Sequence, residues 1–260
     1  MNISGRIAVV TGAAGGIGSA IVRALIANGA KLVVATDLNE AAIQTSDKII
    51  ARHLDVANEA QTKALVEEIE KLHGPVDFWF ANAGVANGGG PEAPDSMWML
   101  QWNVNVMAHV YATRALLPGW LSRGEGHLVT TASMAGILST VGDGVYAATK
   151  HAAVGYAEWL AFTYGDKGIR VSCVCPGAVD TDMLRGSGDG DAEKAAATIG
   201  GGDVATPAAA AAAVIAGVTE DRFLIYTHPG LQQFVISKAQ DTDKWIRGMR
   251  RLNAKTEALR

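Results

Sequence analysis

Short, nearly continuous apolar runs alternate along the chain with longer amphipathic stretches. Such runs are typical of strands that are covered by helices on both faces, because both faces are then buried. Seven segments are predicted to be strands: Ile7–Val10, Leu32–Ala35, Lys48–His53, Val76–Ala81, His127–Ala132, Val171–Val174 and Phe223–Tyr226. This repeated alternation predicts an α/β fold, with one doubly wound parallel sheet and right-handed crossovers.

The stretches between these runs show helical periodicity. Ile17, Ile21 and Leu25 recur every four residues, and Gly29 is predicted to end their helix. Residues 58–73 are predicted to form another helix. Its expected apolar stripe is Ala64, Leu65, Ile69 and Leu72.

Composition narrows the class of protein. The chain has 260 residues, 49% of them hydrophobic, and a net charge of −4. This balance excludes disorder for most of the chain and gives no basic field for nucleic acid. No linker divides the sequence, so we expect a single domain over residues 1–260. It would include a glycine-rich substrate loop at 183–206, of which residues 183–202 are expected to act as a mobile lid, and a C-terminal tail at 228–260.

The two cysteines, Cys173 and Cys175, lie two positions apart on a predicted strand. That spacing predicts side chains on one face, too far apart for an unstrained disulfide. Reduced thiols favour a cytoplasmic protein. No apolar stretch is long enough to predict a membrane-spanning helix. The six histidines show no metal-ligand spacing, so no metal site is expected.

A glycine-rich segment, residues 11–18, follows the first predicted strand and precedes a helix. Gly12 can turn the chain, Gly16 can let the backbone approach a pyrophosphate, and Gly18 can let the helix pack closely on the sheet. The N-terminus of the helix would offer free N–H groups to phosphate. The alternative interpretation is a tight turn that happens to be rich in glycine.

Asp37 stands at the end of the second predicted strand, 19 residues after Gly18. A carboxylate there can accept hydrogen bonds from ribose hydroxyls and would repel the additional phosphate of NADP. Neither residues 13–15 nor Leu38 supply a cation for that phosphate, so NAD is the expected cofactor. The alternative role for Asp37 is as an N-cap of a short helix.

Two further strand ends fit one bound dinucleotide. Asp55 and Val56 follow the third strand, where Asp55 could reach an adenine amino group or, alternatively, cap the helix that starts near Asn58. Residues 82–84, Asn-Ala-Gly, follow the fourth strand and offer a small, flexible passage. These positions lie at the carboxyl ends of strands, where open α/β sheets bind ligands.

Ser133 follows the fifth predicted strand, with Tyr146 and Lys150 beyond it. Tyr146 and Lys150 are four residues apart, so they share one face of a helix. A tyrosine is a poor base at neutral pH, but a nearby cation favours its phenolate. Tyr146 could then take the proton of an alcohol, and Ser133 could hold the substrate oxygen. Considered alone, a tyrosine and a lysine at this spacing are more often a surface pair than a catalytic one.

These motifs occur in order and at compatible spacings. Together they resemble the short-chain dehydrogenase/reductase family over residues 3–226. The resemblance implies a seven-stranded Rossmann sheet and a homotetramer or a homodimer. It implies four catalytic residues, Asn105, Ser133, Tyr146 and Lys150. Ala81 and Ala132 depart from common family residues, and Ser139 lies too close to Tyr146 to replace Ser133.

The resemblance also implies that residues 176–181 close over a nicotinamide, and that Asn105 supports a proton relay from Lys150. The predicted cofactor-binding residues are Gly12, Ala14, Gly16, Ile17, Gly18, Asp37, Leu38, Asp55, Val56, Asn82, Ala83, Gly84, Tyr146, Lys150, Pro176, Gly177, Val179 and Thr181.

The resulting hypothesis is an NAD-dependent oxidoreductase that acts on a neutral secondary alcohol or its ketone, with no nucleic-acid or membrane partner. Its alternatives are an NADPH-dependent ketoreductase and a non-catalytic protein that senses a dinucleotide. The tail carries seven cations and three acids over residues 228–260. It is predicted to be an amphipathic helix that packs on its own or a neighbouring subunit, with a membrane-surface helix as the alternative.

Overall fold

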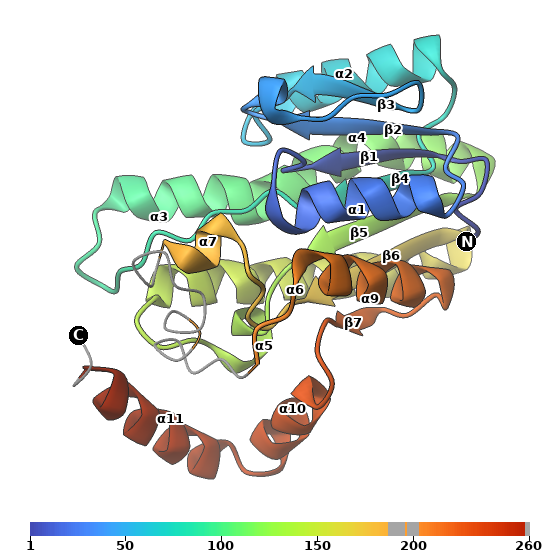
Figure 1. Ribbon diagram of the computed structural model, residues 1–260. Coiled ribbons are helices and arrows are strands. Elements are labelled where there is room, and N and C mark those ends of the chain that lie inside the picture. The colour runs from blue at the N-terminus through green and yellow to red at the C-terminus, as the bar shows by residue number, and fades with distance from the viewer. Residues whose placement is uncertain (187–195, 197–202, 258–260) are drawn as a thin grey trace.

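Seven parallel strands form one sheet at the centre of the computed structural model, which describes residues 1–186, 196 and 203–257 (Figure 1). The strand order is β3-β2-β1-β4-β5-β6-β7, so the chain reverses its direction of winding beside β1. The strands are β1 Ile7–Thr11, β2 Leu32–Asp37, β3 Ile49–His53, β4 Phe78–Ala81, β5 Gly126–Thr131, β6 Ile169–Cys175 and β7 Leu224–Tyr226. All seven predicted strands are therefore present, and the predicted doubly wound α/β fold is confirmed.

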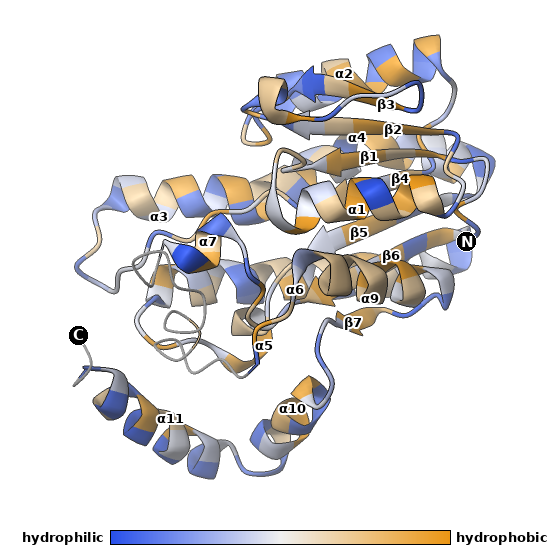
Figure 2. Ribbon diagram, viewed as in Figure 1, coloured by the Kyte–Doolittle hydropathy of each residue, from blue (hydrophilic) through white to orange (hydrophobic). Residues whose placement is uncertain are grey.

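Helices cover both faces of the sheet and enclose two apolar clusters. One cluster contains side chains from α1 and α9, and the other contains side chains from α2, α4 and α6. The helices are α1 Gly16–Ala27, α2 Glu59–Leu72, α3 Asp95–Trp102, α4 Ala108–Arg123, α5 Ala135–Leu138, α6 Gly144–Tyr164, α7 Asp182–Arg185, α9 Pro207–Thr219, α10 Leu231–Gln240 and α11 Thr242–Glu257. Figure 2 shows the corresponding hydropathy, with apolar strands inside and more hydrophilic helix surfaces outside.

The predicted apolar stripe of α2 is partly wrong. The buried face is Thr62, Leu65, Val66 and Ile69, whereas Ala64 is exposed and Leu72 is 61% exposed. The observed positions follow the i, i+3, i+4, i+7 spacing of one helix face. Leu72, the last residue of the helix, lies beyond the area that α4 and the sheet cover.

Cys173 and Cys175 are buried and free. Their Sγ atoms are 4.0 Å apart, which is closer than the alternation of an ideal strand predicts. The distance is still about twice the S–S bond length, so these thiols are unbridged as expected.

The C-terminal tail forms two helices rather than the one expected. The chain breaks between α10 and α11 at Asp241, whose carboxylate accepts a hydrogen bond from the backbone N–H of Lys244. Leu231, Val235 and Trp245 pack against the cluster on the α6 face, so the tail contacts its own subunit. Most of the predicted substrate loop lies outside the described residues. Within the described residues, no helix combines the length and apolarity that crossing a membrane requires.

Gly18 and Gly15 provide a matched test of helix–sheet packing. A Cβ on Gly18 would lie 2.0 Å from the carbonyl oxygen of Gly12, whereas a Cβ on Gly15 would meet nothing within 4 Å. We expect Gly18→Ala to lower the free energy of unfolding by about 1–3 kcal/mol, because the backbone must move to admit the methyl group. Gly15→Ala should leave it nearly unchanged. Denaturant titration of both variants measures the difference, and equal stabilities would contradict the close packing.

Candidate active site

The carboxyl ends of β1, β2, β4, β5 and β6 open into one cavity of about 1890 Å³. Most ligand pockets measure about 300–1,000 Å³, so this cavity has room for a dinucleotide and a second molecule. The predicted site residues that line it are Gly12, Gly16, Ile17, Asp37, Asn82, Ala83, Gly84, Ser133, Tyr146, Lys150, Pro176, Gly177, Val179 and Thr181. The structure thus brings together side chains that the sequence separates by more than 160 positions.

The glycine-rich segment packs against the segment that follows β4. Gly12 has a φ of +65°, and a Cβ there would lie 2.9 Å from the Cα of Ala83. The hydroxyl of Thr11 accepts hydrogen bonds from the backbone N–H groups of Asn82 and Ala83, both at 3.0 Å. The Asn82 amide in turn donates to the carbonyl of Thr11 at 3.0 Å. Thr11 therefore holds the glycine-rich segment against the residues that follow β4, a role that the sequence analysis did not assign to it.

The N-terminus of α1 fits an anionic group. Gly15 at its N-cap provides no capping side chain, and the first turn contains no acidic residue. The first N–H groups of a helix have no partner within the helix, and the helix dipole favours negative charge there. Because this end lines the cavity, it is suited to the pyrophosphate of a dinucleotide.

Asp37 reaches the same cavity from the end of β2. One of its carboxylate oxygens accepts the N–H of Ala14 at 3.0 Å, and the other accepts the N–H of Asn39 at 3.0 Å. These bonds hold the carboxylate in place while both oxygens keep capacity for further hydrogen bonds. The nearby Arg52 guanidinium is engaged by Glu68 at 2.8 Å.

Several predicted cofactor residues lie outside the lining of the main cavity. Leu38 is 66% exposed and belongs to a shallow neighbouring pocket. Asp55 accepts the N–H of Ala57 at 2.9 Å, and the N-cap of α2 is Asn58 rather than Asp55. Four further predicted site residues are not part of the lining: Ala14, Gly18, Val56 and Asn105.

Lys150 is buried beneath the cavity, with 2% of its surface exposed. Its ammonium group donates to the carbonyl of Thr131 at 2.9 Å. A Cβ on Gly84 would lie 3.2 Å from the Lys150 Nζ, so a glycine at this position leaves room for the lysine. Burial lowers the pKa of Lys150 to about 8.

Asn105 lies beside Lys150 on a π-helical turn, Asn103–Met107, that joins α3 to α4. Its side chain accepts the N–H of Val85 at 3.0 Å, donates to the Val85 carbonyl at 2.9 Å and donates to the Thr149 hydroxyl at 3.1 Å. Asn105 thus connects the segment after β4 with α6. Asn103, two positions earlier, is only partly buried.

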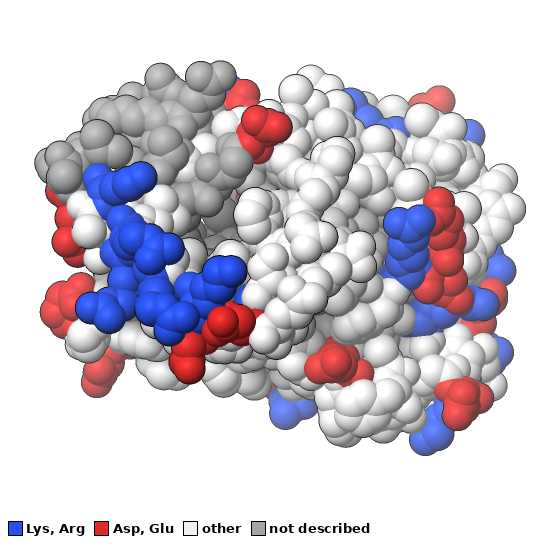
Figure 3. Space-filling model, turned by 90° about the horizontal axis from the view of Figure 1, so that it is seen from below, with Lys and Arg blue, Asp and Glu red and all other residues white. Residues whose placement is uncertain are grey.

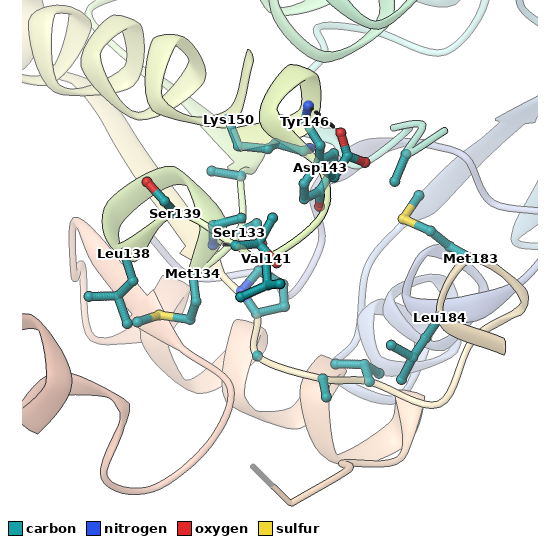
Figure 4. Close-up of a pocket in the computed structure, with 18 of the residues that line it drawn as sticks. Ser133, Met134, Leu138, Ser139, Val141, Asp143, Tyr146, Lys150, Met183 and Leu184 are labelled. Atoms are coloured by element: carbon teal, nitrogen blue, oxygen red, sulfur yellow. Dashed lines mark hydrogen bonds between the residues drawn. The ribbon is translucent and has the colours of Figure 1, made fainter. Parts of the chain in front are cut away.

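Ser133, Tyr146 and Lys150 converge in the cavity, while Ser139 points away from Tyr146 (Figure 4). The N–H of Ala135 donates to the Ser133 hydroxyl at 3.0 Å, which fixes that side chain. Burial raises the pKa of Tyr146 to about 12, and a hydrogen bond with Ser133 partly offsets this effect. In the ligand-free chain, burial therefore outweighs the stabilisation of the phenolate that the sequence analysis expected from Lys150.

Asp143 is a site residue that the sequence analysis missed. Its carboxylate accepts the N–H of Tyr146 at 2.8 Å and the N–H of Gly88 at 2.9 Å. It therefore caps α6 within one turn of Tyr146 and joins that helix to the loop after β4. An aspartate three residues before Tyr146, at the start of a predicted helix, is the capping signal that could have identified it.

The segment after β6 forms another wall of the cavity. Pro176 accepts the N–H of Met134 at 2.9 Å, and Val179 forms a bridge with Ala205. The Thr181 hydroxyl accepts the N–H of Leu184 and thereby caps α7. A Cβ on Gly16 would lie 3.1 Å from the Thr181 side chain, so this segment comes close to the glycine-rich turn.

This arrangement has counterparts among known proteins. The family model for short chain dehydrogenases matches residues 6–192. The chain belongs to the short-chain dehydrogenase/reductase family. A 3beta-hydroxysteroid dehydrogenase from Eggerthella lenta is 34% identical to it over 192 residues, which are 70% of this chain and 74% of that protein.

Solved structures of short-chain dehydrogenases share the fold. A family member from Burkholderia phymatum, solved in complex with NAD, superposes with a TM-score of 0.83 at 28% identity, covering 94% of this chain and 96% of that one. A short-chain dehydrogenase from Burkholderia cenocepacia, solved in complex with NADP, has a TM-score of 0.81 at 22% identity, covering 94% and 97%. Family members are oxidoreductases that bind a nicotinamide dinucleotide, and likeness to these two structures leaves open which dinucleotide this chain uses.

The burial of Lys150 predicts a pH-dependent effect on stability. Because its pKa falls from 10.5 to about 8 on folding, the unfolded chain binds more protons there between those values, and the parent gains stability as pH rises. Lys150→Met removes this gain. The stability of the parent relative to the variant should increase by about 2 kcal/mol between pH 7.5 and pH 10. Denaturant titrations at both pH values measure it, and a constant difference would contradict the assignment.

Proposed function

We propose that this chain catalyses the reversible NAD-dependent oxidation of a secondary alcohol to a ketone. The observation that carries the proposal is the convergence of Ser133, Tyr146 and Lys150 on one cavity. The same cavity contains the uncapped N-terminus of α1 and the carboxylate of Asp37. A protein that only sensed a dinucleotide would need the N-terminus of α1 and Asp37. It would not need Ser133, Tyr146 and Lys150 together.

Each side chain has a distinct role in the proposed reaction. Tyr146 accepts the proton of the alcohol, and Ser133 donates a hydrogen bond to the substrate oxygen. Lys150 supplies positive charge near Tyr146, because its Nζ lies 5.5 Å from the centre of the Tyr146 ring. A bound oxidised nicotinamide would accept the hydride from the carbinol carbon. The two transfers together leave the carbonyl of the ketone.

Lys150 also needs a route for protons. Burial keeps it from direct exchange with solvent, and Asn105 holds the segment beside it through the backbone of Val85. We assign to Asn105 the support of a proton relay between Lys150 and solvent. The Asp143 cap fixes the first turn of α6, and with it the backbone of Tyr146.

The preference for NAD rests on the charges near the end of β2. Asp37 would lie close to the 2′ position of the adenosine ribose, where an additional phosphate would meet a carboxylate. Leu38 carries no charge, and Arg52 is paired with Glu68. The runner-up, an NADPH-dependent ketoreductase, would need a free cation at this place.

The reacting end of the cavity favours an uncharged part of the substrate. Besides Asp143, Lys150 and Ser139, five side chains labelled in Figure 4 line the cavity with Ser133 and Tyr146 and are apolar. They are Met134, Leu138, Val141, Met183 and Leu184. Because an ionised group loses its hydration in such surroundings, a neutral alcohol or ketone is the better substrate at this end.

We also propose a homo-oligomer, a tetramer or else a dimer. Large apolar side chains are exposed on α3 and α6, among them Trp102, Trp159 and the 72% exposed Phe162. Exposed apolar groups of this size favour association with a second copy. The free, buried cysteines fit a reducing compartment such as the cytoplasm. Light scattering at several protein concentrations measures the mass.

The choice of cofactor gives one prediction. NAD(H) should bind to the parent more tightly than NADP(H). The double variant Asp37→Ala with Leu38→Arg should shift the preference toward NADP(H), because a repulsive charge is replaced by an attractive one. Fluorescence titration of both cofactors with parent and variant measures this. Tighter binding of NADP(H) by the parent would overturn the NAD assignment while leaving the family unaffected.

The assignment of the base gives another prediction. Tyr146→Phe keeps the ring but removes the proton acceptor, so it should fold and bind NAD while turnover falls by at least about 10²–10⁴-fold. Ser133→Ala should keep cofactor affinity and lose turnover. Because burial raises the pKa of Tyr146, alcohol oxidation by the parent should increase with pH. Rates, cofactor affinities and thermal melts test these expectations, and near-parental turnover by Tyr146→Phe would refute the role of Tyr146.

A further inference from the structure

The two C-terminal helices form an outer wall of the same cavity that contains Ser133 and Tyr146. In Figure 1, α10 and α11 extend below the sheet and curve away from β7. Their side chains nevertheless line the cavity, among them Leu231 and Phe234 from α10 and Lys244, Trp245, Met249 and Arg251 from α11. The rings of Phe234 and Trp245 are 6.4 Å apart, which joins the two helices.

Helix α11 presents two adjacent faces. Trp245, Met249, Leu252 and Thr256 are at least partly buried, at the spacing of one helix face. Lys244, Gly248, Arg251 and Lys255 fall on the neighbouring face, at intervals of four, three and four residues. Two of these cations, Lys244 and Arg251, line the cavity together with the apolar residues. The wall therefore changes along its width from apolar to cationic.

The cations outnumber the acids of this helix. Over Thr242–Glu257 there are five Lys and Arg residues and two acidic residues, Asp243 and Glu257. Among the residues that the structure describes, none of the five cations forms an ion pair within 4 Å. Asp241, which also lines the cavity, has one oxygen bonded to the backbone N–H of Lys244. Figure 3 shows the resulting band of Lys and Arg beside a hollow in the surface.

The helix dipole explains the positions of only some of these cations. A cation in the last turn of a helix is favourable, which suits Lys255 alone among the five. Lys244 lies in the first turn of α11, where the dipole disfavours a cation. A cation that opposes the dipole, and that lines the cavity on one face with Arg251, is better explained by an anionic partner in the cavity.

We infer that the substrate is amphipathic, with its reacting carbon at Ser133 and Tyr146, an apolar body along α10 and α11, and a distal carboxylate or phosphate at Lys244 and Arg251. This inference rests on the proposed function and narrows its substrate class. The expectation of a neutral substrate then applies to the reacting end alone. The cations hold the far end of the molecule without entering the apolar surroundings of Tyr146.

Matched probe alcohols test the inference. The anionic probes are 7-hydroxyoctanoate, 9-hydroxydecanoate, 11-hydroxydodecanoate and 9-hydroxydecyl phosphate, and the neutral controls are the methyl esters of the three acids. Each probe carries a secondary alcohol near one end, and the different lengths sample the reach to α11. The parent should show a lower KM for at least one anionic probe than for its neutral control, and added salt should reduce the difference. Comparing 9-hydroxydecanoate with its phosphate counterpart shows which anion the site prefers.

Two double variants separate a specific contact from overall charge. Lys244→Met with Arg251→Met removes the two cations that line the cavity and keeps most of their apolar length. Arg247→Met with Arg250→Met removes the same charge from exposed positions of α11 outside the lining. The first pair should lower kcat/KM for the preferred anionic probe by about five- to thirtyfold and leave the neutral probe within about twofold. The second pair should have little effect on either probe.

A binding measurement keeps the inference separate from the proposed reaction. Calorimetric titration with decanoate and dodecanoate needs no turnover, and the parent should bind at least one of them more tightly than the first double variant does. Absence of turnover with every probe would count against the proposed reaction with alcohols of this type, and the titration would decide the anion site independently. Equal KM values for anionic and neutral probes in an active parent would overturn the inference. Equal losses in the two double variants would also overturn it, because they would assign the effect to the overall positive charge of α11 rather than to Lys244 and Arg251.

Discussion

The burial of one ammonium group organises the site. Lys150 has almost no exposed surface, and a charged group in such surroundings is costly unless it is hydrogen-bonded. The carbonyl of Thr131 accepts a hydrogen bond from it, and the absence of a side chain at Gly84 leaves space beside it. His109 is buried as well, and burial together with the charge of Lys150 lowers its pKa to about 3. That imidazole is therefore neutral and adds no second charge to the interior.

Two polar side chains, Asn105 and Asp143, join the loop after β4 to the helix that carries Lys150. Asn105 binds the backbone of Val85 and the hydroxyl of Thr149, which immediately precedes Lys150. Asp143 binds the backbone of Gly88 and of Tyr146. The loop after β4 is thus attached twice to α6, once near each of its two functional side chains. These contacts hold the loop against the helix that carries Tyr146 and Lys150.

The sequence predicted the sheet well because apolar runs report directly on burial. It located the glycine-rich turn, Asp37, Ser133, Tyr146 and Lys150 because each lies at a strand end or at helical spacing. It did not predict the π-helical turn at Asn105, since one additional residue per turn leaves no periodic signal over so short a segment. It also missed the buried face of α2, where Leu72 fits the apolar period but extends past the surface that would cover it. The assembly of α10 and α11 into a cavity wall depends on contacts between distant segments, which local patterns do not encode.

The match to the family ends at residue 192, whereas the wall made by α10 and α11 begins at Leu231. The floor of the cavity is built from strand ends that the central sheet holds rigidly, and the wall is built from helices at its margin. In the proposed function, substitutions in the wall would consequently change how the far end of the substrate is held and would leave the proposed catalytic groups in place. Met134, Met183 and Leu184 line the reacting end from within the matched residues, so recognition of the substrate is divided between two separate stretches of the polypeptide.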